Sequence, residues 1–378
     1  MARSNLERVL IVHPFGIGDA LFVTPVIRAL CENGAQKIDL ILGSRTRELF
    51  ETHPAVDQIF VADRDRLRSQ SIFQSIREIA ALLGKLRKNR YGLLLDFSLS
   101  RQYAFFAFLF FGIPKRVGFS YKNRGIFLTD RIELPGGFSG KHAVDYYLDL
   151  LGQIPLAVSS RNLELYLNAS DESEARSVFE SLHFHPSRPF LAVAPGGGES
   201  WGKDARLKRW PADYFFKLIE KTRAEFGTRL FEFVVVLGGK NEWELGESLR
   251  LKDPVRIFNL CGKTSLRTSA AILKSARFLV ANDGGLVHMA SAVGTPVLAL
   301  FGPVDPKVYG PYPPALNRAA ITNDGPECRP CYQNMRYNRD CQHIDCLNTL
   351  YPETVFRIAR ERGFFECFFK EELSGSRQ

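Results

Sequence analysis

Short apolar runs alternate with longer stretches in which apolar residues recur every three or four positions along the first half of this chain. The runs predict strands and the periodic stretches predict helices. Strands that alternate with helices favour an α/β domain with a parallel sheet covered by helices on both faces. The predicted strands are 9–12, 38–42, 58–61 and 92–96, and the predicted helices are 20–33, 45–52, 71–88 and 102–111.

The second half of the chain repeats this alternation after a polar stretch at 168–177. A length of 378 residues fits two domains better than one core. We therefore predict Rossmann-like domains at 1–170 and 171–350, followed by a helix and tail at 351–378. Ligands of such sheets bind beyond the carboxyl ends of the strands. The predicted elements are strands 190–194, 231–237, 256–259, 277–281 and 297–301, and helices 212–226, 242–251, 265–275 and 285–293.

Composition narrows the classes of function. A net charge of +9 favours an anionic partner such as a nucleotide phosphate, an anionic lipid or nucleic acid. No recognised nucleic-acid module accompanies the basic residues, so nucleic acid is not expected. The polar start at 1–8 predicts no signal peptide and hence a cytoplasmic protein. The apolar run 103–113 is shorter than the ~20 residues of a spanning helix and predicts a buried helix. Its basic flanks leave a membrane-surface patch as the alternative.

The first candidate site follows strand 9–12. Gly16 and Gly18 form a tight turn before a helix, where backbone N–H groups suit phosphate. Asp19 is placed to act as a general base, or as a plain helix cap. The dinucleotide fingerprint is incomplete because Leu21 replaces its third glycine. Arg45 after the second strand would accept a 2′-phosphate, which leaves an NADP-dependent oxidoreductase as an alternative.

A second candidate site begins with three consecutive glycines at 196–198. Gly197 would let the backbone approach a ligand, although a mobile loop is the alternative. Arg206 and Lys208 favour a diphosphate ligand, since cations neutralise such a leaving group. Glu199 is a candidate for contacts with sugar hydroxyls.

A third candidate site is the segment 282–288, which again joins a strand to a helix. Gly284 and Gly285 present N–H groups at the start of the helix. Asp283 could accept a hydrogen bond from a sugar hydroxyl. His288 is either a structural residue or a donor to phosphate.

Three motifs together resemble glycosyltransferase family 9, which includes the ADP-heptose:lipopolysaccharide heptosyltransferases. They are GxGDxxxxTPxxRxL at 16–30, KRWP at 208–211 and NDGGLVHMASAVGTPVLALFGPVDP at 282–306. The resemblance implies the GT-B fold, in which two Rossmann-like domains face each other across a cleft and a C-terminal helix returns to the N-terminal domain. Here the stretch 195–208 is longer and richer in glycine than in well-known members.

The resemblance also implies roles for individual residues. Asp19 would be the catalytic base, and Gly16 and Gly18 would lie in the acceptor-binding domain. Lys208 would contact the donor phosphate. The remaining donor-binding residues would be Gly197, Glu199, Asp283, Gly284, Gly285 and His288.

The predicted function is therefore inverting transfer of heptose from an ADP-sugar donor to a glycolipid acceptor, the lipopolysaccharide core. A single base with in-line attack inverts the anomeric carbon, and no catalytic metal is expected where cations and helix N-termini hold the phosphates. Such an acceptor would bring the protein to the cytoplasmic face of the inner membrane. Alternatives are another nucleotide-sugar donor, the oxidoreductase, or a non-catalytic nucleotide-binding module.

Four of the seven cysteines lie within nineteen residues, at 328–346. In a chain without a secretion signal, this spacing favours metal over disulfides. Four thiolates would form a closed structural site for zinc or iron, with free thiols as the alternative. The predicted ligands are Cys328, Cys331, Cys341 and Cys346.

Overall fold

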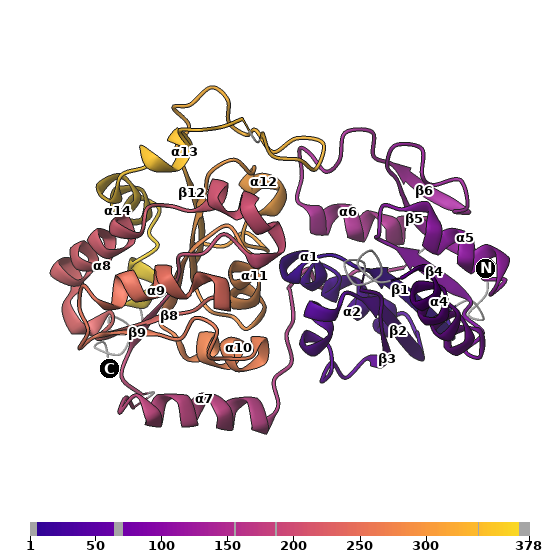
Figure 1. Cartoon of the computed structure of the whole chain (residues 1–378), viewed down its shortest axis with the longest axis horizontal. Coiled ribbons are helices and arrows are strands. Elements are labelled where there is room, and N and C mark those ends of the chain that lie inside the picture. The colour runs from indigo at the N-terminus through magenta and orange to yellow at the C-terminus, as the bar shows by residue number, and fades with distance from the viewer. Residues whose placement is uncertain (1–5, 64–70, 155, 186, 339, 370–378) are drawn as a thin grey trace, which may run out of the picture. The chain divides into compact units, whose positions relative to one another are not determined.

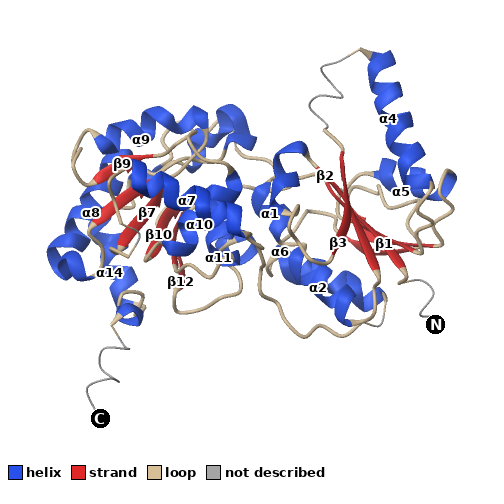
Figure 2. Ribbon diagram, turned by 90° about the horizontal axis from the view of Figure 1, so that it is seen from below, coloured by secondary structure: helices blue, strands red, loops and turns tan. Residues whose placement is uncertain are grey.

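A computed structural model describes residues 6–63, 71–154, 156–185, 187–338 and 340–369. Contacts within the chain divide it into two compact units, Met1–Tyr166 and Leu167–Gln378 (Figure 1). The sequence places this boundary at 170/171, four residues later. Each unit holds one parallel sheet flanked by helices, as predicted (Figure 2).

The first unit is built on a sheet with the strand order β3-β2-β1-β4-β5-β6, in which every pair is parallel. Its strands are β1 (Arg8–His13), β2 (Lys37–Leu42), β3 (Val56–Val61), β4 (Leu93–Asp96), β5 (Lys115–Ser120) and β6 (Asp130–Glu133). Its helices are α1 (Ile17–Leu21), α2 (Thr24–Glu32), α4 (Ile72–Arg87), α5 (Arg101–Leu109) and α6 (Ala143–Asp149), with 3₁₀ turns η2 (Ser44–Leu49) and η3 (Leu150–Gln153).

Two features of the first unit differ from the sequence prediction. The helix predicted at 20–33 is two helices, α1 and α2, and Pro25 stands in the first turn of α2. Proline fits there because the first N–H groups of a helix have no intrahelical partner. The strands β5 and β6 were not predicted. The sequence of β6 is Asp-Arg-Ile-Glu, so it carries no apolar run and is defined by its pairing with β5.

The second unit has the strand order β12-β11-β10-β7-β8-β9, again with parallel pairs. Its strands are β7 (Phe190–Ala194), β8 (Phe233–Val236), β9 (Ile257–Asn259), β10 (Phe278–Asn282), β11 (Val297–Phe301) and β12 (Arg318–Thr322). Its helices are α7 (Ala169–Ser181), α8 (Ala212–Phe226), α9 (Trp243–Arg250), α10 (Leu266–Ser275), α11 (Gly285–Ala292), α12 (Pro306–Tyr309), α13 (Asp345–Asn348) and α14 (Pro352–Glu361), with 3₁₀ segments η4 (Glu199–Lys208), η5 (Gly227–Arg229), η6 (Lys240–Glu242) and η7 (Glu366–Phe368).

The polar stretch at the start of the second unit is the helix α7, which the sequence analysis treated as a boundary. Asn168 is its N-cap and accepts a hydrogen bond from the Asp171 N–H at 3.0 Å. The Asp171 carboxylate accepts in return from the Asn168 N–H at 2.7 Å. This reciprocal capping box begins the helix. The Arg267 guanidinium of α10 pairs with the same carboxylate and so fixes α7 against the unit.

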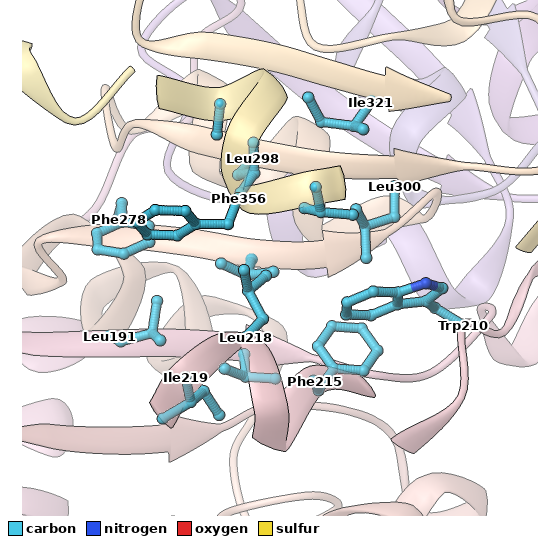
Figure 3. Packing of buried hydrophobic residues seen from close by; sticks show 14 of the residues in the cluster. Leu191, Trp210, Phe215, Leu218, Ile219, Phe278, Leu298, Leu300, Ile321 and Phe356 are labelled. Atoms are coloured by element: carbon cyan, nitrogen blue, oxygen red, sulfur yellow. The ribbon is translucent and has the colours of Figure 1, made fainter. Parts of the chain in front are cut away.

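The C-terminal helix α14 belongs to the second unit. It packs against α8 and β12. Val355 and Phe356 lie in the hydrophobic core of this unit, where Figure 3 shows Phe356 near Leu298. Phe364 and Phe365, just after the helix, are buried in the same cluster. The return of a C-terminal helix to the N-terminal domain stays a prediction, and α14 itself packs within the second unit. The reason is the apolar face of α14, which is buried against α8.

The apolar run 103–113 forms most of α5, and this helix is only partly buried. Ala104 and Ala107 face the core, whereas Phe108, Leu109 and Phe110 are exposed. The prediction of a buried helix is thus wrong on one side of α5. Within the described residues, no helix is long and apolar enough to cross a membrane.

Candidate functional site

Asp19 lies at the carboxyl end of β1, in the first turn of α1. The N-cap of this helix is Gly16, whose backbone is extended (φ −72°, ψ 178°). Gly18 is the second helical residue and Asp19 the third, so Asp19 is not the helix cap. Its side chain is half-buried. A carboxylate in the first turn is favoured by the unpaired N–H groups there.

A buried polar pair lies in the same region as Asp19. The His13 Nε2 atom, at the end of β1, is 3.0 Å from the Tyr147 hydroxyl of α6. Burial lowers the pKa of His13 to about 3, so its imidazole is neutral at physiological pH. Burial also raises the pKa of Tyr147, and the negative charge of Asp19 raises it further. Tyr147 therefore interacts both with His13, through the hydrogen bond, and with Asp19, through its charge.

A second carboxylate follows the neighbouring strand. Asp96 is the last residue of β4, which pairs with β1 so that Val12 and Asp96 are partners. The Ser98 N–H donates to its Oδ1 atom at 2.9 Å. Burial raises the pKa of Asp96 to about 6. None of His13, Tyr147 and Asp96 was a candidate from the sequence, although Asp96 ends a predicted strand and His13 directly follows one.

In the second unit, the KRWP and NDGG motifs meet through an ion pair. The Lys208 Nζ atom is 2.8 Å from the Asp283 Oδ2 atom, and both side chains are buried. From the sequence, Lys208 is a candidate for contact with the donor phosphate and Asp283 for contact with sugar hydroxyls. In the structure the two charges neutralise each other, and the carboxylate fixes the ammonium in place.

Asn282 joins the same motifs to the glycine-rich loop. Its Oδ1 atom accepts from the Trp210 N–H at 3.1 Å, and its Nδ2 group donates to the Pro195 carbonyl at 2.7 Å. The strands β7 and β10 are neighbours in the sheet, which brings the loops that follow them together. Three segments distant in sequence thus form one site at the carboxyl ends of the strands.

Two of the three glycines at 196–198 are required by packing within the unit. A Cβ atom on Gly196 would lie 1.8 Å from the Glu242 carboxylate, and one on Gly197 would lie 2.1 Å from the Ala205 carbonyl. Glu242 is buried and accepts from the N–H groups of Gly198 (3.2 Å) and Gly239 (2.9 Å). This carboxylate therefore holds the loops after β7 and β8 together. The sequence analysis did not identify it.

The side chain of Glu199 lies outside the described part of the structure, although its backbone begins η4. Gly284 is the extended N-cap of α11, and Gly285 is the first helical residue. His288 is buried one turn further along α11. The Asp283 N–H donates to the Leu300 carbonyl at 3.0 Å, which anchors this turn to β11.

The four clustered cysteines carry free thiols. Cys328 is exposed, and Cys346 is buried. Burial raises the pKa of Cys346 to about 12, with smaller contributions from the charges of Cys331, Cys341 and Cys328. Among the residues that the structure describes, no three His, Cys, Asp or Glu side chains are arranged to hold a metal ion. The predicted metal centre is therefore not formed by the thiols as they stand here.

Comparison with known proteins identifies the family. The sequence model of glycosyltransferase family 9 (heptosyltransferase) matches residues 79–339, more than half of the chain. The chain is 29% identical over 251 residues to lipooligosaccharide heptosyltransferase 2 of Haemophilus influenzae, covering 63% of this chain and 67% of that protein.

Two solved structures share its fold. One is the Escherichia coli ADP-heptose lps heptosyltransferase II, with a TM-score of 0.70 and 21% identity over 95% of this chain and 99% of that one. The other is the Escherichia coli heptosyltransferase WaaC with ADP, with a TM-score of 0.67 and 19% identity over 94% and 99%. These likenesses show an α/β, GT-B fold. With the match to the family model, they establish that this chain is a glycosyltransferase and belongs to glycosyltransferase family 9, the heptosyltransferase family.

Proposed function

We propose that this enzyme transfers heptose from ADP-heptose to a lipopolysaccharide-core acceptor, with inversion at the anomeric carbon. Family membership supports heptosyl transfer. The names of the similar proteins support lipopolysaccharide or lipooligosaccharide as the acceptor class. The solved complex of WaaC with ADP supports an adenine nucleotide as the donor.

Asp19 is the proposed base, and its position carries the proposal. Its half-buried carboxylate lies at the carboxyl end of β1, where ligands of parallel sheets bind. Asp19 takes the proton of the acceptor hydroxyl, whose oxygen then bonds to the anomeric carbon. The bond from that carbon to the diphosphate breaks on the opposite face, and ADP leaves. Gly16 and Gly18 form the turn against which the acceptor would bind.

The donor would bind at the second-unit site. The N–H groups of Gly284 and Gly285 and the Lys208 ammonium stabilise the negative charge of the departing diphosphate. Asp283 holds that ammonium at 2.8 Å. Gly197, Glu199 and His288 complete the proposed donor site, as the resemblance implies.

The substitution Asp19→Asn tests the proposed base. Its carboxamide keeps the shape of the side chain and cannot take the proton. We expect heptosyl transfer to fall by roughly 10²–10⁴-fold while ADP binding stays within twofold of the unsubstituted enzyme. Asp149→Asn is the matched control, because Asp149 forms an exposed ion pair with Lys141 in the same unit. Equal turnover in Asp19→Asn and the unsubstituted enzyme would remove Asp19 from the mechanism. If neither protein transfers heptose, the result would favour a non-catalytic nucleotide-binding module.

Parallel calorimetric titrations with ADP, UDP, GDP and NADPH test the donor. Selective binding of ADP supports an ADP-sugar. Preference for UDP or GDP would keep the transferase and replace the donor. Tight binding of NADPH alone would contradict the proposal that the turn at Gly16 and Gly18 binds a sugar acceptor, and would favour the oxidoreductase.

We also propose that the enzyme works in the cytoplasm, in peripheral contact with the inner membrane, because its acceptor is a glycolipid. Cofractionation with membranes at low salt and release at high salt would support this location. Recovery only in the soluble fraction at low salt would contradict it.

The remaining proposal is a structural zinc or iron ion bound by Cys328, Cys331, Cys341 and Cys346. Binding would require the four thiols to move closer together. The mutual influence of their charges supports it, since it places the four groups near one another. Metal analysis of the purified protein should find about one ion per chain, and Cys331→Ser should lose it. An unsubstituted protein with no metal, purified without chelators, would contradict the proposal.

A further inference from the structure

An exposed apolar surface covers the end of α5 in the first unit. Phe108, Leu109 and Phe110 are exposed by 53%, 55% and 46%, and Ile126 in the following loop by 60%. The Phe108 and Phe127 rings stack with centroids 6.3 Å apart, which joins this loop to the helix. We call these four exposed residues the α5 surface.

The segment of the chain that carries this surface is basic. The segment 97–129 contains five Lys and Arg residues and no Asp or Glu. Three of them, Arg101, Lys122 and Arg124, are exposed. The α5 surface therefore belongs to a segment that combines exposed apolar side chains with a net positive charge.

Arg116 keeps the surface in this shape. Its guanidinium lies 5.2 Å from the centre of the Phe108 ring. It also donates to the Ile113 carbonyl at 2.5 Å and to the Phe127 carbonyl at 2.7 Å. These contacts of Arg116 connect the end of α5 to the loop that contains Phe127. They therefore fix the part of the chain that exposes the apolar side chains.

We propose that the α5 surface docks on an anionic lipid bilayer. Aromatic and aliphatic side chains enter the interface between headgroups and acyl chains, while nearby cations attract anionic headgroups. Two copies of the surface would bring like charges together, so charge complementarity favours a bilayer over a second copy of this chain. The inference rests on the proposed function because that function supplies a glycolipid acceptor, which the enzyme would reach by docking on the bilayer.

Vesicle sedimentation with the full chain tests this inference. The probe is a vesicle of phosphatidylethanolamine and phosphatidylglycerol, without any glycolipid acceptor. We expect the triple substitution F108S/L109S/F110S to lower the partition coefficient by at least roughly tenfold, since each side chain loses part of its apolar transfer. A bound fraction equal to that of the unsubstituted protein would overturn the proposal.

A matched control is L251S/V255S in the second unit, where the two side chains are exposed by 65% and 75%. This control should bind vesicles like the unsubstituted protein. Equal loss of binding in the control would show non-specific adsorption and overturn the proposal.

A second variant tests the three exposed basic residues of the segment. R101Q/K122Q/R124Q should weaken binding to the anionic vesicles, and vesicles of phosphatidylcholine alone should bind the unsubstituted protein more weakly. Equal binding to both kinds of vesicle, with no effect of the charge substitutions, would contradict an anionic partner.

Further measurements separate the possible failures. Analytical ultracentrifugation that finds a dimer lost only in F108S/L109S/F110S would identify a second copy as the occupant and overturn the proposal. Circular dichroism and thermal unfolding of the triple variant should match the unsubstituted protein, which shows that its first unit is folded. ADP titration should also match, because the proposed donor site lies in the second unit. If ADP does not bind the unsubstituted protein, the proposed function is contradicted. The proposal of lipid binding is tested separately, by vesicle sedimentation.

Discussion

The buried pair of Lys208 and Asp283 allows a quantitative prediction. Lys208→Met keeps the apolar part of the side chain and removes the ammonium 2.8 Å from the Asp283 carboxylate. The two side chains are exposed by only 6% and 8%, so water cannot replace the lost partner. Removing one member of a buried ion pair costs about 3–5 kcal/mol of the free energy of unfolding, because a buried charge is left uncompensated.

This loss should be visible by differential scanning calorimetry of the full chain. The second unit spans residues 167–378. In a domain of about 150–250 residues, each kcal/mol shifts Tm by about 2–4 °C. We therefore expect the transition of this unit to move down by roughly 6–20 °C in Lys208→Met. The double variant Lys208→Met/Asp283→Asn should recover much of the loss, because it leaves no unpaired charge.

Lys252→Met is the matched control for this experiment. Lys252 pairs with Asp213 at 2.8 Å in the same unit, but both side chains are exposed. Exposed pairs contribute about 0–1 kcal/mol, so Tm should change little. A Tm for Lys208→Met equal to that of the control, or a double variant no more stable than Lys208→Met, would refute the reasoning. Weaker ADP binding by Lys208→Met is interpretable only below its unfolding temperature.

Three further predictions concern stability. The pKa of His13 is lowered to about 3 in the folded protein, so the unfolded chain alone gains a proton below about pH 6.5, and stability is lost as pH falls from 6.5 toward 3. His13→Gln should therefore show a smaller fall in Tm between pH 7 and 5 than the unsubstituted protein, and an identical fall would contradict the assignment. The pKa of Asp96 is raised to about 6, so its contribution has the opposite sign: stability is lost as pH rises from about 4 through 6. Asp96→Asn should be more stable than the unsubstituted protein by up to about 3 kcal/mol above pH 7 in urea titrations, and no more stable below pH 4. Gly196→Ala should cost about 1–3 kcal/mol because its Cβ would overlap Glu242, whereas Gly284→Ala, whose nearest contact is 3.7 Å away, should leave Tm within about 2 °C; similar values for both would contradict the packing argument.

Local patterns in the sequence were sufficient for elements that are buried along their whole length. The strands β7 and β11 are continuous apolar runs, and β10 is apolar up to Asn282, because helices cover both faces of a parallel sheet. The helix α8 has the predicted bounds, 212–226, since its apolar positions follow the period of a helix. The parallel α/β fold and the positions of the loops that carry the candidate sites followed from these patterns.

Edge strands and partial burial required the tertiary structure. The strand β6 lies at the edge of its sheet and has a polar sequence, so only its register with β5 defines it. The helix α5 is apolar on all sides, and which side is exposed depends on where β4 and the loop near Phe127 pack against it. The hydrophobic periodicity of one segment shows neither the strand pairing of β6 nor the exposed side of α5.

The contacts within the sites were likewise decided by the tertiary structure. The sequence by itself singled out Asp19, Lys208 and Asp283 as chemically suited residues. It could not show that Lys208 and Asp283 neutralise each other, because the two are far apart in the chain and meet only through the pairing of β7 with β10. Nor could it select Glu242, whose role arises from two loops that converge on one carboxylate. Residue chemistry is local and can be read along the chain, whereas partners and burial depend on which strands become neighbours.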